Sequence, residues 1–176
     1  MYIWTGCKLP EDFASFIRSR CVELNRDIGL STVAFSLPQH ISLKISFQSE
    51  DYNEILDYLE DYLSKQSPFS LCMQNPEQAG SILWMPVEEN HRLRQLHEQL
   101  DAQLEQHFGV PQHQFDKYFL FHSTLFMDSD TDKIAQMCRM LEEYPIEREL
   151  QVDTFLLGLS ETGKPGTYRV VREIKV

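Results

Sequence analysis

The feature that most constrains this chain is a unit that occurs twice along it: a strand, a short acidic turn, an amphipathic helix, a proline and a further strand. The first copy has its strand at 40–47 and its helix at 51–65, and the second has them at 118–127 and 132–143. Polar and apolar residues alternate in the first of these strands, and apolar residues recur at helical spacing in the helices. This repetition predicts two similar lobes that face each other.

The segments outside the repeat complete a mixed α+β fold. Glycine and proline bound most of these segments and mark the turns between them. Further helices are predicted between Pro10 and Gly29 and at 88–108, and further strands at 2–7, 67–73, 81–87, 149–159 and 167–176. We expect the strands at 67–73 and 81–87 to pair as a hairpin. A chain of 176 residues that is 42% hydrophobic suits one domain with its own core.

The charge of the chain restricts its partners. The formal net charge is −11, with 16 basic and 27 acidic residues. Proteins that grip long nucleic acids do so by neutralising backbone phosphates with lysine and arginine, so we expect no extended nucleic-acid surface. A small anion held in a local pocket remains compatible with this charge. The sequence does not indicate an oligomeric state.

Cysteine usage and hydropathy point to the cytoplasm. Cys7, Cys21, Cys72 and Cys138 form no C-x-x-C pair, so we expect free thiols in a reducing compartment. The amino-terminal residues lack the basic and apolar regions of a secretory signal. No stretch reaches the roughly 18 apolar residues of a membrane-spanning helix, so we expect no membrane association.

The candidate chemistry lies in two short motifs, one in each copy of the repeat. His40-Ile41-Ser42 is followed by Leu43, and His122-Ser123-Thr124 is followed by Leu125. Residues i and i+2 of a strand point to the same face, so each histidine has a hydroxyl beside it. The hydroxyl can bind a phosphate oxygen while the imidazole transfers a proton. The other four histidines have no serine or threonine two residues later. His91 and His97 lie six residues apart and lack the spacing of a zinc pair, so we expect no metal.

This pair of motifs, with the order of elements around it, resembles the 2H phosphoesterase superfamily, which includes 2′-5′ RNA ligase-like proteins and cyclic phosphodiesterases. The resemblance implies a bilobal α+β fold of two pseudo-symmetric antiparallel sheet lobes with flanking helices, in a single domain over residues 1–176 with a central cleft. It also implies activity on 2′,3′-cyclic phosphates, 2′-5′ linkages or ADP-ribose cyclic phosphate, without metal or cofactor. The matching residues are His40 and His122 as catalytic groups and Ser42 and Thr124 as phosphate-binding groups.

The chain departs from this family pattern in one place. Some relatives carry a basic residue shortly after the second motif, where this chain has Phe126, Met127 and Asp128. Lys44 shares a strand face with His40 by alternation and is the candidate substitute. This departure bears on the substrate more than on the type of reaction.

Aromatic residues near the motifs are candidates for stacking a base. Trp4 and, by strand parity, Phe126 are the two residues expected to do so, and packing in the core is the alternative for both. Trp84 lies in a predicted hairpin strand and is expected in the core.

Two histidines can divide the proton chemistry of phosphodiester cleavage. Because histidine titrates near neutrality, one imidazole can accept a proton while the other donates one, although the sequence does not assign the roles. Two alternatives remain: a protein that binds or sequesters a small nucleotide without turnover, and an RNA-end ligase or tRNA-processing factor.

Overall fold

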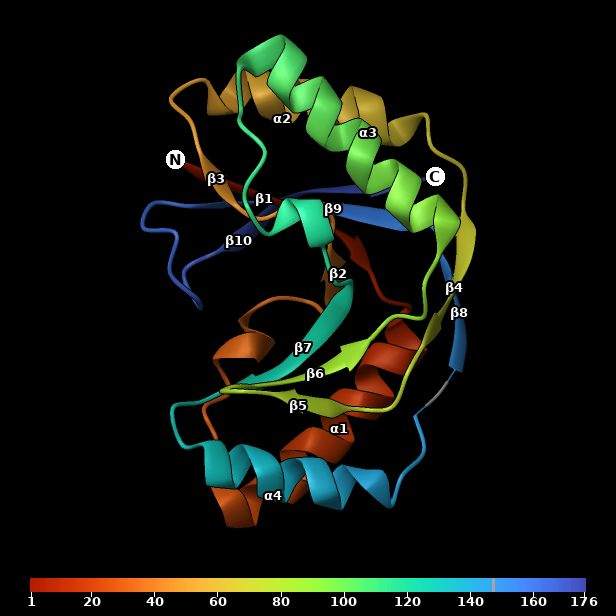
Figure 1. Ribbon diagram of the computed structural model, residues 1–176, viewed down its shortest axis with the longest axis vertical. Coiled ribbons are helices and arrows are strands. Elements are labelled where there is room, and N and C mark those ends of the chain that lie inside the picture. The colour runs from red at the N-terminus through yellow and green to blue at the C-terminus, as the bar shows by residue number, and fades with distance from the viewer. Residues whose placement is uncertain (147) are drawn as a thin grey trace.

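The computed structural model describes residues 1–146 and 148–176, and it places two main antiparallel sheets, with a third sheet of two strands at one side, between two pairs of helices (Figure 1). The helices are α1 (Glu11–Ile28), α2 (Tyr52–Ser64), α3 (His91–Phe108) and α4 (Thr131–Glu142), with short 3-10 helices η1 (Val33–Ser36) and η2 (Asp116–Tyr118). The strands are β1 (Tyr2–Lys8), β2 (His40–Ser42), β3 (Phe47–Gln48), β4 (Phe69–Met73), β5 (Glu77–Ala79), β6 (Ile82–Pro86), β7 (His122–Met127), β8 (Arg148–Val152), β9 (Thr154–Ser160) and β10 (Arg169–Lys175).

Local sequence explains where the two longest helices end. α1 and α3 each bury one apolar face, and each ends at a glycine in the left-handed region, Gly29 at φ 74° and Gly109 at φ 63°. A side chain disfavours this conformation, so glycine stops both helices at the predicted places. Asn90 begins α3 by accepting a hydrogen bond from the Leu93 N–H at 2.9 Å.

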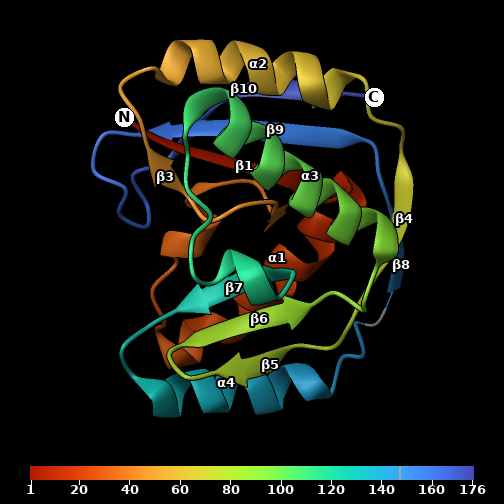
Figure 2. The same ribbon diagram turned by 45° about the horizontal axis from the view of Figure 1, so that its top comes forward.

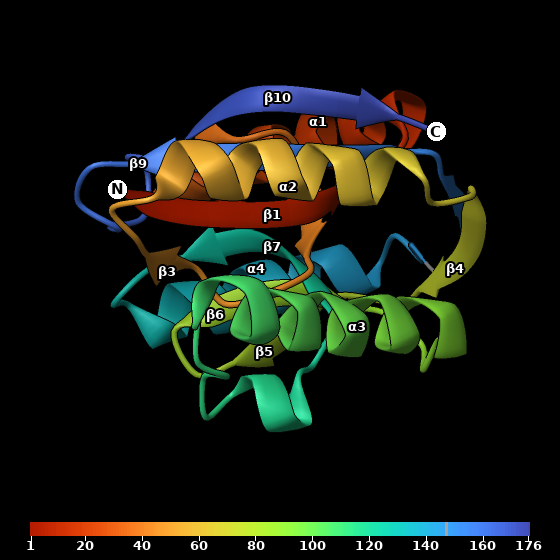
Figure 3. The same cartoon turned by 90° about the horizontal axis from the view of Figure 1, so that it is seen from above.

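Each sheet lies beside its own pair of helices. The larger sheet has the order β10-β9-β1-β2, with β3 also paired to β1, and the smaller sheet has the order β5-β6-β7. α2 and α3 lie at the end of the molecule beside the larger sheet, and α1 and α4 lie toward the other end (Figure 1). Figure 2 shows α2 above β9 and α4 below β5. Seen from above, α2 runs along β9 and β10 (Figure 3).

The two copies of the repeat meet at their last strands. β4 closes the first copy and β8 the second, and the two pair antiparallel with Leu71 opposite Leu150. The predicted hairpin of 67–73 with 81–87 is therefore wrong. These segments meet only at an isolated bridge from Met73 to Val87. The hairpin is instead β5–β6, which turns at Gly80.

Two predicted strands are each divided. The segment 40–47 forms β2 and β3, and residues 43–46 leave the ladder between them. The segment 149–159 forms β8 and β9, which belong to different sheets. In both cases the apolar pattern continues across the break, so hydrophobicity alone does not reveal it.

The core is continuous and has few polar members. Every α-helix of the described chain contributes fully buried aliphatic or aromatic residues to one cluster. None of the four cysteines, all of which lie in the described part of the chain, forms a disulfide, and burial raises the pKa of Cys21 to about 12. Among the described residues, no helix combines the length and apolar character needed to cross a bilayer.

Candidate active site

The first motif is held by the edge of the larger sheet. β2 pairs with β1, which sets His40 opposite Lys8 and Ser42 opposite Gly6. His40 Nδ1 lies 2.7 Å from the carbonyl oxygen of Pro38. A carbonyl only accepts hydrogen bonds, so Nδ1 carries a proton and donates it. This bond fixes the tautomer and leaves Nε2 available for chemistry.

The second motif repeats this arrangement on the smaller sheet. β7 pairs with β6, which sets His122 opposite Pro86 and Thr124 opposite Trp84. His122 Nδ1 lies 2.7 Å from the carbonyl oxygen of Leu120, again two residues earlier. The two histidines therefore share the same tautomer and the same free nitrogen.

A direct hydrogen bond joins the two motifs. Ser123, between His122 and Thr124, is buried and donates its hydroxyl hydrogen to Oε1 of Gln39 at 2.8 Å. Gln39 immediately precedes His40. This bond sets the spacing between two segments that lie 84 residues apart in the chain.

A tryptophan contacts the ring of each motif histidine. The Trp4 ring is inclined at 67° to His40 with ring centres 4.4 Å apart, and Trp84 is inclined at 39° to His122 with ring centres 4.2 Å apart. Trp84 is half-buried and lines the cleft, so the expectation that it lies in the core is wrong. The similarity of the two motifs could have predicted this position of Trp84. β6 pairs with the motif strand β7 as β1 pairs with the motif strand β2, so Trp84 lies beside its histidine as Trp4 does.

Trp4 packs against the site and exposes little of its ring for stacking a base. Its side chain is almost wholly buried, and Nε1 donates to Ser42 Oγ at 3.1 Å. The ring lies against Gly158, where an added Cβ would come within 2.6 Å of it. Since the Trp4 N–H occupies a lone pair of Ser42 Oγ, the serine hydrogen remains free to donate.

Burial changes the acidity of both histidines. Desolvation lowers the pKa of His40 to about 4, with the Pro38 carbonyl opposing and the charge of His122 adding to the effect. Desolvation also lowers the pKa of His122, against the effect of the Leu120 carbonyl.

Both histidines and both hydroxyls line one cleft of about 690 Å³. Its walls come from both sheets, η1, the segment before β7 and the turn between β9 and β10. The aromatic residues in these walls are Trp4, Trp84, Phe115, Tyr118, Phe119 and Tyr168. Among the described residues that line the cleft, none has a carboxylate or thiol side chain.

Phe126 does not lie on the cleft face that strand parity predicts. It is fully buried, with its ring centre 5.2 Å from that of Phe35. Thr124 pairs with Trp84 and Phe126 with Leu83, which leaves Leu125 as an extra residue in β7. Such a bulge shifts the alternation by one residue, and Met127 therefore lines the cleft instead.

Lys44 lies in the cleft wall, but its ammonium group binds elsewhere. Nζ contacts Asp101 Oδ1 at 2.5 Å and Asp116 Oδ2 at 2.8 Å, and the side chain is only 2% exposed. The strand ends at Ser42, so the alternation that placed Lys44 beside His40 does not extend to it. The amine is committed to this buried pair of carboxylates.

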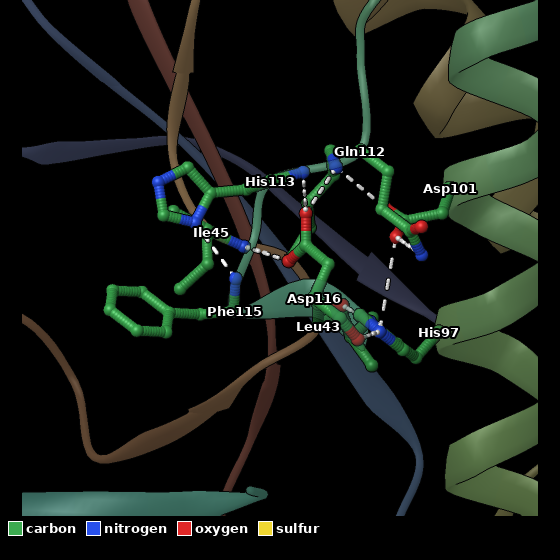
Figure 4. A network of polar contacts seen from close by, with 9 residues as sticks. Leu43, Ile45, His97, Asp101, Gln112, His113, Phe115 and Asp116 are labelled. Atoms are coloured by element: carbon green, nitrogen blue, oxygen red, sulfur yellow. Dashed lines mark hydrogen bonds and ion pairs between the residues drawn. The ribbon is translucent and has the colours of Figure 1, made fainter. Parts of the chain in front are cut away.

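The buried network around Lys44 connects three segments of the chain (Figure 4). Asp116 accepts hydrogen bonds from the Ile45 N–H at 3.3 Å and the His113 N–H at 2.8 Å. His97 Nδ1 and Nε2 lie 2.6 Å and 3.0 Å from the carbonyl oxygens of Leu43 and Asp116. The His97 ring therefore joins these two backbone segments through its two nitrogens.

This network also has the spacing of a metal site. Ligand atoms of His97, Asp101 and Asp116 lie within 4.8 Å of one another. The Lys44 ammonium bridges the two carboxylates, in the place where a cation would bind. A buried amine already bridges both carboxylates and neutralises one of their two charges, so the arrangement fits an ion-pair network better than a metal centre.

The comparisons with known proteins agree with this geometry. The model of the 2′-5′ RNA ligase superfamily matches residues 30–163, which include both histidine motifs. No curated protein sequence matches the chain.

Solved structures share the fold at low sequence identity. TT0787 of Thermus thermophilus is 20% identical, with 99% of this chain and 97% of that chain covered and a TM-score of 0.67. E. coli LigT complexed with 3′-AMP is 16% identical, with 99% and 96% covered and a TM-score of 0.60. LigT complexed with NADP+ is 18% identical, with the same coverage and a TM-score of 0.61. The chain therefore belongs to the 2′-5′ RNA ligase superfamily, a group of the 2H phosphoesterases.

Proposed function

We propose that this protein is a metal-independent phosphoesterase that hydrolyses a cyclic phosphate or a 2′-5′ phosphodiester on a nucleotide or RNA end. The observation that carries the proposal is the matched pair of histidines in one cleft. Each donates Nδ1–H to a carbonyl two residues earlier, and each has a hydroxyl on its own strand face. General acid–base transfer at a phosphate needs two such groups, and the cleft supplies both.

We assign His40 as the general base. Burial of the ring against Trp4 favours the uncharged form, and a pKa of about 4 keeps His40 neutral near pH 7. Nε2 of the neutral ring takes a proton from water. The water oxygen then forms a bond to phosphorus as the bond from phosphorus to the leaving ribose oxygen breaks.

We assign His122 as the general acid. Trp84 presents its ring system at a 39° tilt, and an aromatic face stabilises a neighbouring cation. Protonated Nε2 gives its proton to the ribose oxygen as that oxygen leaves. Ser42 and Thr124 donate hydrogen bonds to the non-bridging oxygens, where negative charge increases in the transition state. After one turnover the protonation states of the two rings are exchanged.

The complexes of a structural relative support a nucleotide substrate. E. coli LigT has been crystallised with 3′-AMP, phosphate, ATP and NADP+. The absence of carboxylate and thiol side chains from the described lining of the cleft supports chemistry without a metal.

The test uses substitutions at the two histidines. His40→Asn and His122→Asn should each reduce kcat at least about 10³-fold on a 2′,3′-cyclic nucleotide or a 2′-5′ dinucleotide, because each removes one proton-transfer group. His91→Asn changes an exposed histidine outside the cleft and should retain wild-type activity. Activity should also persist after dialysis against EDTA.

Three outcomes would point elsewhere. Full activity in either cleft variant would contradict the mechanism. Tight nucleotide binding without product in the wild-type protein would indicate a sequestering protein. Turnover of RNA ends alone, or joining of ends, would indicate the processing factor or ligase.

A further inference from the structure

The cleft holds very little positive charge. Among its described lining residues, only His40, His122 and Lys44 have side chains that can be cationic. No arginine lies in the lining, and the chain as a whole has a net charge of −11. Each phosphate that enters such a cleft therefore depends on these three groups.

Lys44 cannot serve as a phosphate ligand without breaking its own contacts. Its ammonium is bound by Asp101 and Asp116, and all three side chains are at most 6% exposed. Moving the amine to a phosphate would leave two buried carboxylates without their cation, which is strongly unfavourable. The positive charge of Lys44 is thus balanced inside the protein.

The remaining groups suffice for one phosphate. The two free Nε2 atoms and the hydroxyls of Ser42 and Thr124 can surround one phosphorus, with the Ser42 oxygen already oriented by Trp4. No cationic group among the described lining residues is left for a second phosphate.

The rest of the wall is largely apolar and partly open, and the polar side chains in it, such as Ser36, Gln39 and Ser46, are uncharged. Phe115, Tyr118 and Leu120 lie in the segment before β7 and are 63%, 77% and 66% exposed. Large exposed apolar side chains gathered at a cleft are typical of a binding surface. Flat rings at this position suit a base, because stacking needs no charge.

We infer that the cleft selects a substrate with a single phosphate group and a flat aromatic part, such as a nucleoside 2′,3′-cyclic phosphate, and disfavours substrates with further phosphates. The inference deepens the proposed function and rests on it. The inference distinguishes between the substrate classes that the family resemblance implies. ADP-ribose cyclic phosphate carries an additional diphosphate, and the terminal nucleotide of an RNA carries an additional 5′ phosphodiester, so we expect both to be poorer substrates than a nucleoside 2′,3′-cyclic phosphate.

The test compares two substrates that differ by one phosphate: adenosine 2′,3′-cyclic phosphate and the same compound with a 5′-phosphate. The additional phosphate should lower kcat/KM by about tenfold through a higher KM, because a charged group enters an apolar wall without a counter-ion. An equal or higher kcat/KM for the 5′-phosphorylated compound would overturn the inference.

A substitution tests the cause of the preference. Met127 lines the cleft directly after the second motif, so Met127→Arg places a cation in the wall. The ratio of kcat/KM for the phosphorylated over the unphosphorylated compound should rise at least about fivefold in this variant. Met127→Leu, the matched uncharged change, should retain the wild-type ratio. An unchanged ratio in Met127→Arg would count against the inference.

Binding of product analogues separates this inference from the proposed function. The dissociation constants of adenosine 2′-phosphate and adenosine 2′,5′-bisphosphate are measured by calorimetry. Weaker binding of the bisphosphate supports the inference even if neither cyclic compound is hydrolysed, a result that would reject only the proposed turnover. Tighter binding of the bisphosphate would reject the single-phosphate inference itself.

Discussion

In each of the two motifs, a backbone carbonyl orients the histidine ring. Pro38 O and Leu120 O each receive a proton from the Nδ1 of the histidine two residues later, at 2.7 Å in both cases. The same tautomer therefore arises at both motifs without a carboxylate partner. Since a carbonyl carries no charge, it orients the ring while the pKa remains controlled mainly by burial.

The first prediction at the residue scale concerns pH. The kcat/KM profile should be bell-shaped, because the base must be neutral and the acid protonated. The acid limb should lie near pH 4, the pKa of His40, and the alkaline limb below the ordinary histidine value of 6.5, because burial lowers the pKa of His122. Initial rates between pH 3.5 and 9 measure both limbs. A plateau that extends to pH 8 would contradict the assignment of His122 as the acid.

At the same scale, the sequence identified four residues that the fold brings to one cleft, but not every neighbour of these residues. The motif spacing placed His40, Ser42, His122 and Thr124, and all four line one cleft. Trp84 was missed because a tryptophan in an apolar hairpin strand has the same pattern in a core as beside a site. Its contact with His122 depends on the β6–β7 register, which joins segments about 40 residues apart.

At the scale of elements, breaks in the strands decide which side chains reach the cleft. β2 ends at Ser42, and beyond this end the Lys44 amine binds Asp101 and Asp116. The bulge at Leu125 places Met127 in the cleft wall and Phe126 in the core. Strand parity predicts side-chain direction only while the ladder is regular. Both breaks depend on partners distant in the chain, so local alternation did not reveal them.

The prediction for these elements concerns the buried network. Asp116 in η2 binds the Lys44 amine and two backbone N–H groups, and so ties the segment before β7 to the segment after β2. Asp116→Asn retains the shape but removes a charge, and should lower the free energy of unfolding by about 2–4 kcal/mol. Urea denaturation measures the loss.

An exposed ion pair provides the matched control for this prediction. Asp61 contacts Lys65 at 2.5 Å, with both side chains about two-thirds exposed. Asp61→Asn should change the free energy of unfolding by less than about 1 kcal/mol, because water screens a surface pair. Equal losses in the Asp116 and Asp61 variants would show that the buried network does not stabilise the fold.

At the scale of the whole molecule, the two copies of the repeat are joined rather than separate. β4 and β8, the last strands of the two copies, pair with each other, and Ser123 donates across to Gln39. α1 follows β1 of the larger sheet but packs against α4 on the other side of the molecule. Connections that cross between halves favour a single cooperative unit.

Two tryptophans allow this cooperativity to be measured. Trp4 lies in the larger sheet and Trp84 in the smaller one, and the chain has no other tryptophan. The fluorescence of Trp84→Phe therefore reports on the larger sheet, and that of Trp4→Phe reports on the smaller sheet. Within each variant, the urea midpoint by fluorescence should coincide with that by far-UV circular dichroism. Separate midpoints would show that the two sheets unfold independently.

The sequence by itself determined the repeated unit, the helix ends at Gly29 and Gly109 and the four residues of the two motifs, because each depends on local spacing or backbone preference. The tertiary structure alone decided the pairing of β4 with β8, the neutralisation of Lys44 and the place of Trp84. These features join residues that are far apart in the chain. Their energies come from pairing and burial between distant segments, which local patterns of residues do not record.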